Sequence, residues 1–256
     1  MESSAARWIE VLRHSHDALR AMVEPLDDDR LSAQSYAKEW SIAQVLSHLG
    51  SGAEIFGLFV EAGLNGSEPP GGEAFIPIWA AWNAKSPAAQ AADALRADGA
   101  LVQRLESLND TQLASLRLAF FGQDLDAAAM ARMRLSEHAI HSWNIAVAID
   151  PTAAVAEESV VLLVDTLDQL AARVGKPTGD ATRVRVSVTD PEREFVLETA
   201  DTVTLTQSPG DGAPDLRLSA EAFIRLLYGR LDPANTPPVQ GEASILDDLR
   251  PVFPGF

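Results

Sequence analysis

The sequence contains no cysteine among its 256 residues. Disulfide bonds, thiolate metal sites and a cysteine nucleophile are therefore excluded. Any thiol that takes part in chemistry would have to come from a separate small molecule. A chain without thiols also fits the reducing cytoplasm, which is the location we expect.

A long apolar run is also lacking. No stretch of about 18 apolar residues occurs, so we expect no membrane-spanning helix and no membrane partner. The N-terminal segment has no apolar core of the length found in secretory signals. Its sequence is MESSAARWIEVLRHSHDALR.

Basic residues are scarce, with 20 Lys and Arg against 37 Asp and Glu, which gives a net charge of -17. This excess of negative charge repels phosphate backbones, so we expect no nucleic-acid partner. Hydrophobic residues make up 46% of the chain, which is enough to bury a full core. The composition therefore indicates folded domains and not a disordered chain.

Apolar residues recur at helical spacing through the first two thirds of the chain. The predicted helices span residues 4–24, 41–63, 87–108, 125–149 and 155–174. Ser41 and Gln44 have the spacing of a capping box, which marks the start of the second helix. These patterns predict a helical N-terminal domain.

The pattern changes at about residue 178. Short segments of alternating or β-branched residues predict strands at 183–188, 195–197, 203–205 and 216–218. Helices are predicted at 219–228, with Ser219 as its cap, and at 244–250. We therefore expect a helical domain over 1–177 and a small α+β domain over 178–256.

The predicted helix 125–149 carries polar residues on a face that its apolar residues mark as inward. Glu137 and His141 are four residues apart, so their side chains lie on the same face of the helix. A carboxylate that faces a core is costly unless it is paired or binds a metal. The spacing alone fits a metal site, and it also fits an ordinary buried hydrogen-bonded pair.

His48 is the candidate partner of this pair. It lies next to Val45 and Leu49 on the inward stripe of the predicted helix 41–63. Two imidazoles and one carboxylate from facing helices would give three ligands and leave positions open, as in catalytic zinc sites. Zinc is the divalent ion that we expect, and Fe(II), Ni(II) and Mn(II) are alternatives.

The remaining polar candidates are weaker. His14 and His16 have no carboxylate at ligand spacing on their helix, so we interpret them as surface or packing residues. His138 points about 100° away from the Glu–His face and flanks it or faces elsewhere. Asn144 follows His141 by one turn, where it orients the imidazole or makes a simple buried hydrogen bond.

Two segments resemble the signatures of the DinB-like metalloenzymes. They are WSIAQVLSHL at 40–49 and LSEHAIHSWN at 135–144, and the branch they resemble most is the mycothiol-dependent maleylpyruvate isomerase family. This resemblance implies a DinB-like four-helix bundle followed by a small, sterol-carrier-like α+β domain. It also implies that the metal ligands are His48, Glu137 and His141. The second signature usually has the form E-x-x-x-H-x-x-D, and here Asn144 stands in place of the Asp.

The resemblance further implies an activity. Family members use mycothiol as a thiol cosubstrate, and a divalent metal lowers the pKa of a bound thiol so that its anion exists near neutral pH. We therefore expect a metal-dependent isomerase or S-transferase acting on a small electrophilic substrate, as a monomer or homodimer. The alternatives are a metal-dependent hydrolase and a non-catalytic protein that binds metal or apolar ligands.

The C-terminal domain is expected to contribute a basic residue. The segment LLYGRL at 226–231 resembles the family's segment after its C-terminal helix. The resemblance thus implies that Arg230 is a catalytic contact for an anionic substrate or for the carboxylate of the thiol cofactor. Arg225 is the alternative cofactor-binding residue.

Overall fold

A computed structural model of the chain describes residues 4–120, 122–179, 181–208, 212–242 and 244–255. The chain divides into two compact units, Met1–Ala154 and Val155–Phe256. No helix within the described ranges is long and apolar enough to cross a membrane.

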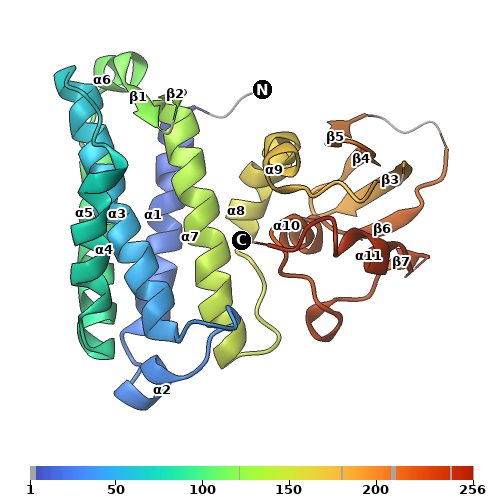
Figure 1. Cartoon of the computed structure of the whole chain (residues 1–256), viewed down its shortest axis with the longest axis horizontal. Coiled ribbons are helices and arrows are strands. Elements are labelled where there is room, and N and C mark those ends of the chain that lie inside the picture. Colours follow the sequence, from blue (N-terminus) through green and yellow to red (C-terminus); the bar gives the residue numbers. More distant parts are fainter. Residues whose placement is uncertain (1–3, 121, 180, 209–211, 243, 256) are drawn as a thin grey trace. The chain divides into compact units, whose positions relative to one another are not determined.

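The first unit is built around four long helices that run alongside one another (Figure 1). They are α1 (Ala5–Val23), α3 (Ile42–Asn65), α5 (Pro87–Glu106) and α7 (Ala127–Ile149). The shorter elements are α2 (Asp28–Ser32), α4 (Phe75–Asn83), α6 (Asp110–Ser115) and the antiparallel strands β1 (Arg117–Phe120) and β2 (Gln123–Asp126). The expected four-helix bundle is confirmed, whereas the prediction missed α4 and the β1–β2 hairpin.

Side-chain caps explain where the long helices begin. The side chains of Ser4, Ser41, Ser86 and Asp126 each accept a hydrogen bond from the backbone N–H three residues later. Gln44 completes the predicted capping box at the start of α3. These caps satisfy backbone donors that the first turn of a helix leaves without partners.

Within the bundle, α3 packs mainly against α5 and α1 mainly against α7. Gly50 of α3 allows α3 and α5 to approach closely. A Cβ at this position would overlap the Trp82 ring and lie 2.9 Å from the Cα of Ala94. Trp82 is only 2% exposed. The aromatic ring of α4 therefore fills the space that a glycine leaves on α3.

The second unit contains a sheet with the strand order β5-β4-β3-β6-β7 among the described residues. The strands are β3 (Thr182–Thr189), β4 (Arg193–Thr199), β5 (Val203–Gln207), β6 (Leu216–Ser219) and β7 (Gln240–Gly241). Strands β3 and β6 are parallel, and the other neighbours are antiparallel. The helices are α8 (Glu157–Leu163), α9 (Leu167–Val174), α10 (Ala220–Leu227) and α11 (Ser244–Leu249).

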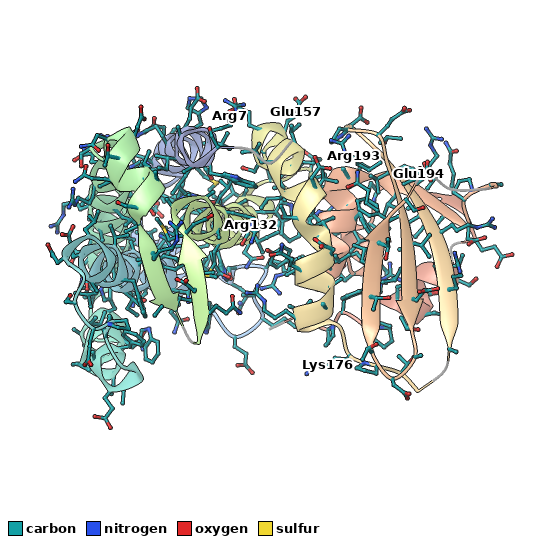
Figure 2. All side chains as sticks on the ribbon, turned by 90° about the horizontal axis from the view of Figure 1, so that it is seen from above. Arg7, Arg132, Glu157, Lys176, Arg193 and Glu194 are labelled. Atoms are coloured by element: carbon teal, nitrogen blue, oxygen red, sulfur yellow. The ribbon has the colours of Figure 1, made fainter. Side chains whose placement is uncertain are left out.

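The division between the units lies 23 residues before the expected boundary at 177/178, counted from 154/155. Helices α8 and α9 belong to the second unit because α9 packs against β5 and α8 against α10. Arg193 of β4, labelled in Figure 2, also donates two hydrogen bonds of 2.6 and 2.9 Å to Asp165, between α8 and α9. The helix predicted at 155–174 is interrupted there by a 3-10 turn at Val164–Thr166.

Candidate metal centre

The three predicted ligands meet inside the bundle. His48 comes from α3, and Glu137 and His141 come from α7. Glu137 Oε2 lies 3.3 Å from His48 Nε2 and 3.5 Å from His141 Nε2. One ligand atom from each residue lies within 4.8 Å of the other two. The structure therefore brings together all three side chains that the sequence singled out.

These separations are long for hydrogen bonds between a carboxylate and an imidazolium, and they also match the spacing of donors around one ion. For bonds of about 2.0–2.1 Å at tetrahedral angles, two ligand atoms of zinc lie about 3.3–3.4 Å apart. A hydrogen bond between an imidazolium and a carboxylate is about 2.7–2.9 Å long. The chemistry of the donor set, two imidazole nitrogens and one carboxylate oxygen, also suits zinc.

Glu137 is the charged member of this centre. Burial by itself raises the pKa of Glu137, but the hydrogen bonds and positive charge of His141 and His48 hold that pKa well below its usual value. The carboxylate is therefore ionised near neutral pH and can act as an anionic ligand. Its side chain is 31% exposed and that of His48 is 39% exposed, so a small molecule can reach the ligands.

Two further side chains shape the centre. The indole of Trp40 lies beside both imidazoles, with ring centroids 5.2 Å from His48 and 6.2 Å from His141. Trp40 was not among the site residues predicted from the sequence. Asn144 is fully buried, and its amide nitrogen lies 3.3 Å from His141 Nδ1, as expected for a residue that orients this imidazole.

The Asn144 amide leaves its Oδ1 without a hydrogen-bond partner among the described residues. When Nε2 of a neutral imidazole binds a metal, its Nδ1 carries a proton and needs an acceptor. A half-turn of the Asn144 amide would place Oδ1 against Nδ1 of His141. This orphaned oxygen is therefore a second feature that fits a metal at the centre.

A second cluster of one carboxylate and two histidines lies buried in the same bundle. Asp98 of α5 lies 2.6 Å from His16 of α1 and 3.0 Å from His138 of α7. Arg134 of α7 donates a 2.6 Å hydrogen bond to the other oxygen of Asp98. All four side chains are at most 4% exposed.

Hydrogen bonds join the members of this buried cluster, although Nε of Arg134 has no partner within the described residues. An ionised carboxylate only accepts, so His16 Nδ1–H and His138 Nε2–H donate to Asp98. Ser15 lies 2.7 Å from the remaining His138 nitrogen, to which its hydroxyl donates. Burial raises the pKa of Asp98, but His138 and Arg134 lower that pKa well below its usual value. Asp98 and Arg134 thus balance in charge without an added cation.

This buried cluster was not predicted from the sequence, because Asp98 lies on α5 and not on the helix of His16. The available signal was the inward stripe of α5, where Asp98 falls among Ala94, Leu101 and Leu105. His14 is exposed and His16 is buried, as the surface and packing interpretations allow.

The two candidate arginines lie in the second unit and make internal hydrogen bonds. Arg225 donates two hydrogen bonds of 2.6 and 3.0 Å to Glu221 and further ones to the carbonyls of Arg230 and Asn235. Arg230 donates to the carbonyl of Tyr228 over 2.6 Å and is 8% exposed. Their expected roles toward a substrate or cofactor stay predictions.

Comparisons with known proteins agree with this fold. Two solved structures match over 90% of this chain and 90% of their own, with a TM-score of 0.67 and 15% sequence identity. They are the mycothiol-dependent maleylpyruvate isomerase and a histidine-to-alanine variant of it. No curated protein sequence gives a significant match.

The family comparison covers the bundle. The family described as the mycothiol maleylpyruvate isomerase N-terminal domain matches residues 12–146, which is more than half of the 256-residue chain. The match includes all three candidate ligands and both sequence signatures. The chain therefore belongs to the mycothiol maleylpyruvate isomerase N-terminal domain family.

Proposed function

We propose that the chain is a metal-dependent enzyme that uses a small-molecule thiol, mycothiol, to attack an electrophilic substrate. Its metal ligands are His48, Glu137 and His141, and zinc is the ion we propose first. The observation that carries this proposal is the spacing of 3.3 and 3.5 Å between Glu137 and the two imidazoles. Family membership supports the choice of thiol.

The chain's own residues would bind and orient the reactants. Three protein ligands leave at least one position of a divalent ion open to a small molecule. The bound ion would supply a Lewis acid that keeps a thiol ionised near neutral pH. Because the chain has no cysteine, this thiol comes from a separate molecule. Asn144 would hold the His141 ring in place, and Trp40 would form an apolar wall beside the ligands.

The reaction class follows from the nucleophile. A thiolate adds to an activated carbon–carbon double bond, which forms a C–S bond and moves an electron pair toward the activating carbonyl. Rotation about the resulting single bond and elimination of the thiolate would return an isomerised alkene. An isomerase therefore regenerates the thiol, whereas an S-transferase consumes it. Maleylpyruvate, named for the two solved relatives, is the first substrate to test.

Arg230 is our proposed contact for a carboxylate of the substrate or of mycothiol. Arg225 remains the alternative candidate, and its guanidinium donates to the Glu221 carboxylate and to two carbonyls. An Arg230→Met variant should raise the KM for substrate or thiol at least tenfold while the bound metal stays stoichiometric. Loss of the metal together with activity would argue for a structural role of Arg230.

The decisive experiment measures bound metal and thiol-dependent turnover in the same preparations. We expect about one equivalent of zinc in the wild type, none in His48→Ala, and one in His14→Ala, a matched change at an exposed histidine. With maleylpyruvate, turnover should require mycothiol, and the thiol balance separates isomerase from S-transferase. A wild type without metal after reconstitution would leave a binding protein, and metal-dependent hydrolysis without thiol would indicate a hydrolase.

A further inference from the structure

The metal ligands come from two helices that contact each other sparingly. Glu137 and His141 share α7, so helix geometry alone sets their spacing. His48 comes from α3, which packs mainly against α5, while α7 packs mainly against α1. The separation of α3 from α7 therefore decides whether the third ligand reaches the other two.

One buried hydrogen-bond network crosses the interface between α3 and α7 beside the ligands. Nη2 of Arg134 on α7 donates a 2.8 Å hydrogen bond to the carbonyl of Leu49, the residue that follows His48 on α3. The same nitrogen lies 2.6 Å from Asp98 on α5. Asp98 in turn accepts from His138, the residue that follows Glu137. The network thus joins the backbone positions next to two of the three ligands.

The guanidinium of Arg134 occupies a closely fitting, buried position. Arg134 is 2% exposed, and Gly52 of α3 gives it room, because a Cβ there would lie 3.1 Å from Nη1. Asp98 is 1% exposed and holds the cation by charge. A buried charge cannot leave such a partner without a large desolvation cost. The guanidinium is therefore fixed against the backbone of α3.

From this geometry we infer that Asp98 and Arg134 are positioning residues for the metal centre, which set the distance between His48 and the ligands on α7. The inference rests on the proposed metal-binding function. A positioning role predicts that loss of the network weakens metal binding by a folded protein. A purely structural role predicts loss of stability alone.

The test uses Co²⁺ as the probe, because its visible absorption reports ligand geometry. The main variant is Arg134→Met with Asp98→Asn, which removes both charges together and leaves the core neutral. We expect its Co²⁺ Kd to rise at least tenfold and its visible spectrum to change, while circular dichroism remains that of a folded bundle. Arg134→Lys, which keeps the charge on a shorter side chain, should shift Kd in the same direction and serves if the double variant does not fold.

Leu105→Ala is the matched control, since Leu105 is fully buried on α5 and is not part of the network. It should lower stability but keep the wild-type Kd and spectrum. Wild-type affinity in both network variants, or an equal loss of affinity in Leu105→Ala, would overturn the positioning role. A wild type that binds neither Co²⁺ nor zinc would instead remove the proposed metal centre, and the inference with it.

Discussion

Among its described residues, the bundle contains two clusters of one carboxylate and two histidines, and both include residues of α7. In the buried cluster, Asp98 lies 2.6 and 3.0 Å from its histidines, and Arg134 balances its charge. In the candidate metal centre, Glu137 lies 3.3 and 3.5 Å from its histidines. Of the two carboxylates, only Asp98 has an arginine as an ion-pair partner within the described part of the chain.

This difference shows that residue types alone do not define a metal site. In the buried cluster, two histidines and the guanidinium of Arg134 already partner the carboxylate, so an added cation would be repelled by a like positive charge. Longer contacts and partial exposure leave the other carboxylate with room and charge for a cation. The buried cluster therefore offers a poor site for an ion of its own, whereas the geometry of the candidate metal centre suits one better.

The largest effect should come from breaking the buried ion pair. Arg134→Met alone strands the charge of Asp98 in the core and should lower the free energy of unfolding by about 3–5 kcal/mol. Glu137→Gln, made in metal-free protein, should change it by less than about 1 kcal/mol, because that side chain is partly exposed. Urea denaturation of the metal-free proteins measures both. Equal losses would erase the distinction between the clusters.

The second prediction concerns metal-linked stability. Zinc at 100 times its Kd should raise the wild-type free energy of unfolding by about 2.7 kcal/mol, because it binds the folded state. His141→Ala should lose this gain, and His16→Gln should keep it. Thermal or urea unfolding with zinc and with a chelator gives the comparison. A gain that disappears in His16→Gln but persists in His141→Ala would place the ion in the buried cluster.

Substitution of Asn144 should change the zinc affinity by a smaller amount. Asn144→Asp restores the acid of the usual signature and should lower the zinc Kd by up to about tenfold, since a carboxylate partner makes the His141 ring a stronger ligand. Asn144→Ala should raise the Kd by a similar factor. Competition with a chromophoric chelator measures both constants. No change in either variant would show that Asn144 only fills space.

The smallest effect is the pH dependence of the buried cluster. The pKa of Asp98 is lowered in the folded state, so the unfolded chain binds more protons as the pH falls below about 4. This contribution to stability is present above that range and is lost on acidification. The unfolding free energy of metal-free wild type should therefore fall more steeply between about pH 5 and 3 than that of Asp98→Asn. Parallel curves would contradict this assignment.

The sequence predicted the parts that depend on local pattern. Helical periodicity and the capping box located α3 and α7, and these helices carry the three ligands to one place. Period-2 alternation located β3, and Ser219 was correctly predicted to cap α10. Family resemblance then supplied the four-helix bundle followed by a small α+β domain, and the structure shows both.

What the sequence did not predict depends on contacts between distant segments. The apolar run of α4 has no polar face that would reveal helical periodicity. The pattern of α8 and α9 predicts one continuous helix, and the turn between them is held by the contact of Arg193 with Asp165. Asp98 pairs with residues 82 and 40 positions away along the chain. No local pattern encodes such a pairing, so the buried cluster emerged only from the packed bundle.

The position of Trp40 has a practical consequence for spectroscopy. The chain has five tryptophans, and Trp40 is the one whose ring contacts the ligand imidazoles among the described residues. Its indole is 36% exposed, whereas Trp82 and Trp143 are buried. A paramagnetic ion held by these imidazoles would quench the emission of Trp40 more than that of the other tryptophans, because its ring lies beside the ligands. Trp40 would thus report optically whether an ion occupies the proposed site, and a Trp40→Phe variant would lose this signal.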